Sequence, residues 1–167
     1  MRSVHMAPEL TTERWFNSDQ PITLSALRGR PVLLYAFQMR CPGCVQYTIP
    51  QAKEVHASYD AAHLAVVGLH TVFEDHATMT PDALAGFIAE HDLRFPIGVD
   101  APSGASIPRT MRAYDMQGTP TIVLVDAAGR RRMQHFGHLS DLQLAGAIAT
   151  LVREARAGVS TDEEGDR

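Results

Sequence analysis

Hydrophobic residues gather in a few short runs along the chain, and turn-forming or polar residues separate them. Residues 32–37 (VLLYAF), 64–69 (LAVVGL) and 121–125 (TIVLV) contain almost no polar side chain, and 95–99 is a shorter run of the same kind. Continuous apolar runs of this length are typical of strands that are buried on both faces of a sheet. The pattern therefore predicts three central strands and one shorter strand.

Between these runs, apolar residues recur at the spacing of an amphipathic helix. The spacing predicts a helix from Pro42 to about Tyr59, which Pro50 should kink because proline lacks a backbone N–H. A second helix should begin at Pro81, with Thr80 as its N-cap. A last helix should follow Ser140 and Asp141, with a core-facing stripe made of Leu142, Leu144, Ala145, Ile148, Leu151 and Val152.

Two less regular segments complete the pattern. Residues 15–17 and 21–24 flank a polar turn, which indicates a short hairpin or a cap at the start of the domain. Residues 130–136 hold only Met133 and Phe136 as apolar members, too few for a buried strand. We therefore expect an edge strand there, and a short helical turn over residues 109–114.

The order of these elements predicts an α/β fold with three layers. Strands that alternate with helices need parallel pairing and crossover helices, whereas the last two strands are close enough for antiparallel pairing. We expect a central mixed β-sheet flanked by helices, with an N-terminal hairpin extension. The predicted division is a flexible N-terminus over 1–13, one domain over 14–156 and a disordered acidic tail over 157–167.

Composition and charge exclude several classes of protein. The 167 residues carry a formal net charge of −4, which argues against nucleic acid as a main partner. No apolar run approaches the ~20 residues of a membrane span, and Arg2 is not followed by the apolar segment of a signal peptide. We therefore expect a cytoplasmic protein without a membrane span, unless a leader was removed.

The chain's only two cysteines, Cys41 and Cys44, lie in the stretch RCPGC. A zinc site needs about four ligands, and no second cysteine pair exists; His135 and His138 are distant in the sequence. A structural disulfide would close a very small loop, which removes little entropy from the unfolded chain. A redox-active dithiol is the favoured interpretation, and we expect no metal.

The predicted elements give this redox interpretation a mechanism. Cys41 falls at the N-cap of a helix, where free backbone N–H groups and the helix dipole stabilise a thiolate. Cys44 lies one turn later on the same side and less exposed, so it can attack a mixed disulfide formed at Cys41. We predict that Cys41 is the attacking thiol and Cys44 the resolving thiol.

A strand followed by Cys-X-X-Cys at the start of a proline-kinked helix resembles the thioredoxin-fold superfamily. The stretch 118–121 (GTPT) is similar to that family's cis-proline loop, and 22–37 (ITLSALRGRPVLLYAF) resembles its TlpA-like and redoxin (AhpC/TSA-related) branch. The resemblance covers roughly residues 15–155. It implies a thioredoxin-like three-layer sandwich and a cis peptide bond between Thr119 and Pro120.

The resemblance also implies an activity and its partners. The protein would be a thiol–disulfide oxidoreductase that acts on protein disulfides or dithiols, without a bound cofactor, and that exchanges electrons with a second dithiol protein. Thr119 and Pro120 would bind the substrate chain, together with Arg40 and Pro42 beside the thiols. Neither the redox potential nor the direction of electron transfer follows from these residues.

Several positions depart from the thioredoxin pattern. Arg40 stands where most such proteins have tryptophan, and the dipeptide between the cysteines is Pro-Gly rather than Gly-Pro. Tyr35 occupies the position of thioredoxin's buried acid, so a proton acceptor for Cys44 must come from elsewhere. Glu74 and His76, just past the predicted 64–69 strand, are the candidates for proton transfer.

Two other functions remain open. Peroxiredoxins share the fold and reduce peroxides with one cysteine, in the pattern Pro-X3-Thr-X2-Cys with a distant arginine. Leu34 and Gln38 occupy the Pro and Thr positions here, although Gln38 has an amide that can donate to a peroxide, and Arg109 or Arg112 is available as the arginine. The last alternative is a redox-inert interaction module, which would gain little from a preserved pair of thiols.

Overall fold

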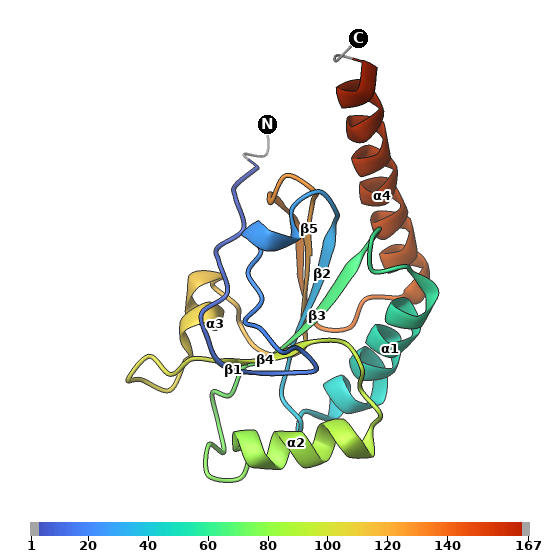
Figure 1. Cartoon of the computed structure of the whole chain (residues 1–167). Coiled ribbons are helices and arrows are strands. Elements are labelled where there is room, and N and C mark those ends of the chain that lie inside the picture. The colour runs from blue at the N-terminus through green and yellow to red at the C-terminus, as the bar shows by residue number, and fades with distance from the viewer. Residues whose placement is uncertain (1–3, 165–167) are drawn as a thin grey trace.

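A single mixed sheet of six strands forms the centre of the molecule (Figure 1). The computed structural model describes residues 4–164, with side chains as far as Gly158. The two central strands, β2 and β3, are parallel, and β4 continues the parallel part, while β1, β5 and β6 are each antiparallel to their neighbours. In order across the sheet, the strands are β1 (Thr12–Phe16), β4 (Ile97–Asp100), β3 (Ala65–His70), β2 (Val32–Phe37), β5 (Thr121–Val125) and β6 (Arg131–Phe136).

Helices cover both faces of this sheet, which confirms the predicted three-layer α/β sandwich. Side chains of α1, α2 and α4 pack on one face, and α3 packs on the opposite face together with residues that precede β2. Figure 1 shows α1 and α4 side by side along one face. The helical elements are η1 (Ser25–Leu27), η2 (Cys44–Thr48), α1 (Ile49–Ser58), α2 (Pro81–Glu90), α3 (Arg109–Ala113) and α4 (Asp141–Glu164).

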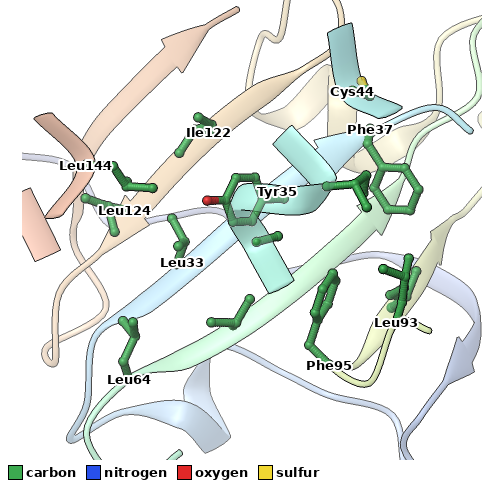
Figure 2. Close-up of a cluster of buried hydrophobic side chains, with 14 of the residues drawn as sticks. Leu33, Tyr35, Phe37, Cys44, Leu64, Leu93, Phe95, Ile122, Leu124 and Leu144 are labelled. Atoms are coloured by element: carbon green, nitrogen blue, oxygen red, sulfur yellow. The ribbon is translucent and has the colours of Figure 1, made fainter. Parts of the chain in front are cut away.

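The central strand β2 is buried along its whole length, as its uninterrupted apolar sequence predicts. Side chains alternate across a strand, so Leu33, Tyr35 and Phe37 enter the core under α1 and α4, while Leu34 and Ala36 enter the core under α3. Figure 2 shows Tyr35 at the middle of the first core, with Cys44 at the end near Phe37. The two cysteines therefore follow directly after a strand that is buried along its whole length.

The predicted helix starts and the predicted edge strand are also confirmed. Thr80 caps α2, because its Oγ1 accepts the Ala83 N–H at 3.2 Å. Ser140 caps α4 in the same way, with its Oγ accepting the Gln143 N–H at 3.2 Å. β6 lies at one edge of the sheet, and its residues alternate between partly buried and exposed.

The predicted N-terminal hairpin is wrong. Residues 12–16 do form a strand, β1, but it pairs with β4 and not with residues 21–24, which form no strand. The register places Trp15 opposite Gly98, where an added Cβ would lie 3.0 Å from the Trp15 ring. A glycine on the distant strand lets the large indole approach closely, and this long-range fit outweighs the local turn.

The part of the chain that packs against the domain begins nearer the N-terminus than predicted. Residues 1–13 were expected to be flexible, yet Leu10 is buried and the Ala7 N–H donates to the Gly129 carbonyl at 2.9 Å. Residues 1–3 of that segment lie outside the described residues. The packed chain thus starts before residue 14, and flexibility at this end stays a prediction.

The last helix differs from its prediction in length and in two inward positions, since Leu142 and Ala145 are both exposed. α4 continues to Glu164, although a disordered tail was expected over 157–167; of that segment, residues 165–167 lie outside the described residues. Leu142 is 86% exposed, because it lies on the opposite side of the helix from the buried Leu144. Within residues 4–164, no helix is both long and apolar enough to cross a bilayer.

Candidate active site

The thiol pair lies where β2 ends and a helix begins. The Cys41 N–H donates to the Gln38 carbonyl at 3.1 Å, which turns the chain after the strand. The Cys41 carbonyl then accepts the Val45 N–H at 3.0 Å, and the Cys41 Sγ accepts the Cys44 N–H at 3.3 Å. The sulfur therefore occupies the position of an N-cap acceptor, as the sequence predicts.

The first turns of this helix are wider than those of a regular α-helix. The Ile49 N–H donates to the Cys44 carbonyl, five residues back, and the widened segment η2 passes directly into α1. Pro50 has no N–H to donate to Gln46, and its ring would crowd that carbonyl in a regular helix. The predicted irregularity at Pro50 thus takes the form of a widened turn that contains Cys44.

The two thiols differ sharply in their surroundings. Both are reduced; Cys41 is partly exposed and Cys44 is 0% exposed. Burial, and then a hydrogen bond to the Cys41 sulfur, raise the pKa of Cys44 to about 12. Hydrogen bonds from the Gln38 backbone and the Thr119 side chain act in the opposite direction. Cys44 is therefore a protonated thiol at neutral pH.

The loop before β5 faces the thiols, and its Thr119–Pro120 peptide bond is cis, as predicted. The Thr119 carbonyl lies 3.5 Å from the Cys41 Sγ and accepts its hydrogen bond. On the other side, Gly43 lies so close to the proline that an added Cβ would be 3.8 Å from the Pro120 Cδ. The loop and the first helical turn thus form one continuous surface around Cys41.

The Gln38 side chain connects three segments of the site through hydrogen bonds. The sequence did not predict this structural role of Gln38. Its side chain is 1% exposed; the Oε1 accepts the Phe73 N–H at 3.2 Å, while the Nε2 donates to Glu74 Oε1 at 3.3 Å and to Thr119 Oγ1 at 3.4 Å. A signal was present: Gln38 is a polar residue directly after an all-apolar strand and directly before the thiol loop.

The other predicted site residues divide into two groups. Glu74 reaches the thiol cluster through Gln38, and Arg40 is exposed with its guanidinium donating to Thr78 Oγ1 at 3.2 Å. Pro42 is exposed at the first helical position. His76, in contrast, lines a cavity of about 200 Å³ between β4 and the start of α2.

Tyr35 stands where thioredoxin has its buried acid, and it is held in a polar cluster under α1. Its hydroxyl donates to Gln51 Oε1 at 3.1 Å, and the Gln51 Nε2 donates at 2.8 Å both to the Leu139 carbonyl and to Asp141 Oδ1. Burial, and then the nearby Asp141 carboxylate, raise the pKa of Tyr35 far above its usual range. Tyr35 is therefore neutral and ties β2 to α1 and α4.

His70 supports the thiol loop from the end of β3. Its ring is 1% exposed, and its Nε2 accepts the Met39 N–H at 3.2 Å. Because that nitrogen is an acceptor, the proton of the neutral ring sits on Nδ1. Burial lowers the pKa of His70 to about 4, so the ring is neutral at physiological pH.

A capped thiol, a buried second thiol one turn later and a cis-proline loop beside them lie together at the end of β2, in a fold of the thioredoxin type. The model of the AhpC/TSA family matches residues 4–132, and the chain belongs to that family. Among curated relatives, it is 29% identical to the protein DipZ of Mycobacterium bovis over 162 residues. That match covers 95% of this chain but only 22% of DipZ, so the chain spans about a fifth of that relative's length.

Solved structures agree with this assignment. The thioredoxin-like superfamily protein SPOA0173 superposes with a TM-score of 0.87 at 50% identity, covering 89% of this chain and 96% of that one. A thiol-disulfide isomerase from Corynebacterium glutamicum superposes with a TM-score of 0.83 at 42% identity, covering 87% and 96%. The fold is therefore that of the thioredoxin superfamily over nearly the whole chain.

Proposed function

We propose that this protein exchanges electrons with protein disulfides through the dithiol Cys41 and Cys44. The observation that carries the proposal is the 3.3 Å hydrogen bond from the Cys44 N–H to the Cys41 sulfur, which places the two cysteines at the start of one helix. A half-exposed sulfur held by a helix N–H is placed to attack, and a buried sulfur one turn later is placed to resolve. The similarity to a thiol-disulfide isomerase from Corynebacterium glutamicum supports the same activity.

The reaction runs in two exchanges. The Cys41 thiolate attacks one sulfur of the substrate disulfide; a mixed disulfide forms and the substrate's other sulfur leaves as a thiolate. Cys44 then loses its proton and attacks the Cys41 sulfur, which releases the second substrate thiolate and leaves a Cys41–Cys44 disulfide. The substrate gains two electrons and two protons, and this protein loses them. A second dithiol protein restores the thiols, and the reverse sequence oxidises a substrate.

Substrate binding is assigned to the surface around Cys41. Because the Thr119 carbonyl already lies within 3.5 Å of the Cys41 sulfur, an extended substrate segment that pairs with the Thr119 backbone brings its own sulfur to Cys41. Pro120 and Pro42 border this position on either side, and the exposed Arg40 adds a positive charge. Glu74 is the proposed group for proton transfer, with His76 as the alternative. No cofactor is needed for either exchange.

The compartment is also part of the proposal. The sequence predicts a cytoplasmic protein, where a reducing environment would favour use of the dithiol as a reductant. A membrane-impermeant maleimide applied to intact cells tests this: Cys41 should remain unlabelled until the cells are lysed. Labelling of intact cells would place the site outside the cytoplasm.

Peroxide reduction is the second candidate, because the chain belongs to the AhpC/TSA family. In that reaction Cys41 would become a sulfenic acid and Cys44 would condense with it to a disulfide and water. Against it, both N–H groups of the Gln38 amide are engaged with Glu74 and Thr119, so Gln38 has none left for a peroxide. Arg109 and Arg112 donate to Pro102 and Ser103 in a loop beyond β4, and neither bonds to the Cys41 sulfur.

Two assays separate these functions. Reduction of insulin disulfides with dithiothreitol should be catalysed by the wild-type protein and lost in Cys41→Ser, whereas Cys44→Ser should accumulate a mixed disulfide at Cys41. Rapid consumption of hydrogen peroxide that survives Cys44→Ser but not Cys41→Ser would favour the peroxidase. Inactivity of the folded wild-type protein in both assays would contradict both and leave the interaction module.

A further inference from the structure

Gln38 is held so that its amide can face in only one direction. The Phe73 N–H needs an acceptor, and the Gln38 Oε1 supplies it at 3.2 Å. The opposite side of the amide, the Nε2, then faces Glu74 at 3.3 Å and Thr119 Oγ1 at 3.4 Å. A carboxylate only accepts hydrogen bonds, which is consistent with the NH₂ group on that side.

This orientation decides what the Thr119 hydroxyl can do. A hydroxyl has one hydrogen to donate and lone pairs to accept. Since the Gln38 amide donates to Thr119 Oγ1, the hydroxyl's own hydrogen remains free for another acceptor. Thr119 lies beside the thiol pair, with its carbonyl 3.5 Å from the Cys41 sulfur, so the sulfur atoms are the acceptors at hand.

Cys44 is the group that needs such a donor. The resolving step requires a thiolate, yet Cys44 is 0% exposed, and the core around it contains Tyr35 where thioredoxin has an acid. A hydrogen bond from the Thr119 side chain lowers the pKa of Cys44, in opposition to the effect of burial. The geometry thus joins a buried amide to the Thr119 hydroxyl, and it places Thr119 directly beside the thiol pair.

We propose that Gln38 is a positioning residue for the resolving step: by donating to Thr119 Oγ1, it turns the Thr119 hydroxyl toward Cys44 and stabilises the Cys44 thiolate. This inference rests on the proposed function. The Gln38 side chain is hydrogen-bonded to Thr119 Oγ1 and to Glu74, and to neither sulfur. It therefore influences the second exchange and leaves the first attack by Cys41 almost unchanged.

A reaction with 5,5′-dithiobis(2-nitrobenzoate) separates the two steps. The Cys41 thiolate attacks this reagent's disulfide and releases the first coloured thiolate, and Cys44 then attacks the mixed disulfide and releases the second. Stopped-flow absorbance follows both releases in one experiment. The second phase, measured as a function of pH, reports on the Cys44 thiolate.

The variant Gln38→Glu tests the direction of the hydrogen bond. The ionised carboxyl group still accepts the Phe73 N–H but cannot donate to Thr119, whose hydroxyl would donate to it and turn away from the sulfur. Because a buried carboxyl group beside Glu74 keeps its proton to higher pH, this variant is compared with Gln38→Met at each pH. The second phase should slow about tenfold at each pH, because a hydrogen bond to a charged group is lost. The first phase should change less than about twofold. Gln38→Met, which also lacks a donor, should behave alike.

Thr119→Val should slow the second phase by a similar factor, and combining it with Gln38→Glu should add little further effect. Thr48→Val is the matched control: its hydroxyl is also buried on the thiol helix but has no hydrogen-bond partner among the described residues, so both phases should be unchanged. Thermal unfolding monitored for every variant confirms that each is folded.

Three results would overturn the inference: an unchanged second phase in both folded Gln38 variants, equal slowing of both phases, or additive effects of Gln38→Glu and Thr119→Val. Failure of the proposed function looks different. In that case the wild-type protein itself would show no distinct second phase, and its trace would match that of Cys44→Ser.

Discussion

Cys41 and Cys44 lie one turn apart on one helix, yet their surroundings differ in exposure and in hydrogen bonding. The Cys41 sulfur is partly exposed, accepts a helix N–H and lies beside the cis-proline loop. The Cys44 sulfur is fully enclosed by the core that contains Phe37 and Ile49. The comparison shows how one helix start provides both an accessible nucleophile and a protected second thiol.

The difference also indicates which step limits the reaction. Attack by Cys41 needs access to the substrate, and the partly exposed position at the helix start provides it. Resolution by Cys44 needs a proton to leave a buried sulfur whose pKa is raised to about 12. We therefore expect changes around Cys41 to act on the first exchange, and changes around Cys44 to act on the second exchange or on stability.

The largest effect should come from pH. Well below its pKa, the thiolate fraction of Cys44 rises about tenfold per pH unit, so the resolving phase should accelerate about a hundredfold between pH 6 and pH 8. Stopped-flow release of the second thiolate measures it. A resolving phase that is flat across this range would mean that Cys44 is already ionised at pH 6, and the comparison would fail.

A second effect concerns stability near the thiol loop. The pKa of His70 is about 4 when folded, against 6.5 for a free histidine, so the unfolded chain binds the proton first. The free energy of unfolding should be intact above pH 6.5 and fall by roughly 3 kcal/mol as the pH drops toward 4.

Urea denaturation across that range measures the slope. In His70→Leu, the part of the slope due to this residue should disappear, while stability at pH 7 also falls because the Met39 N–H loses its acceptor. Identical slopes in the two proteins would contradict the buried, neutral ring.

A smaller effect on stability is expected from a substitution at Tyr35, which lies in the same core as Cys44. Tyr35→Phe removes the hydroxyl that donates to Gln51 and leaves a buried acceptor without its partner, which should cost about 1–2 kcal/mol of unfolding free energy. Both exchange phases should remain within about twofold, because Tyr35 is neutral and takes no proton. A large loss of the resolving phase in folded Tyr35→Phe would instead give Tyr35 the role of thioredoxin's acid.

The smallest effect should come from a substitution at the exposed residue directly before Cys41. Arg40 is exposed and donates only to Thr78, an interaction of a kind worth ~1 kcal/mol or less. Arg40→Gln should therefore slow the first exchange less than about fivefold and leave the second unchanged. Adding salt to the wild-type protein should reproduce most of the change, since salt screens an exposed charge.

Local chemistry predicted much of the site. Pro42 at the first helical position, two cysteines one turn apart and a buried strand before them were enough to place Cys41 at the N-cap. The Gly-Thr-Pro loop, by its resemblance to the superfamily, predicted the cis bond that the structure contains. These features depend on neighbours in the sequence or on a motif, and both are visible without coordinates.

Long-range partners were not predictable in the same way. β1 pairs with β4 rather than with residues 21–24, because the fit of Trp15 against Gly98 depends on strands far apart in the sequence. Gln38 bonds to Phe73, Glu74 and Thr119, which come from two other segments. Its position directly after a buried strand indicated a special role, but nothing in the sequence indicated which residues it would bond to.

By itself, the sequence determined the central strands, the helix starts and the pairing of one accessible with one deeper thiol, since periodicity and capping act within a few residues. Only the tertiary structure decided the edge partner of β1, the direction of the Gln38 amide and the neutral cluster of Tyr35 and Gln51. A buried polar group must bond to whatever chain segment folding brings beside it, and that segment is set by the packing of the whole sheet.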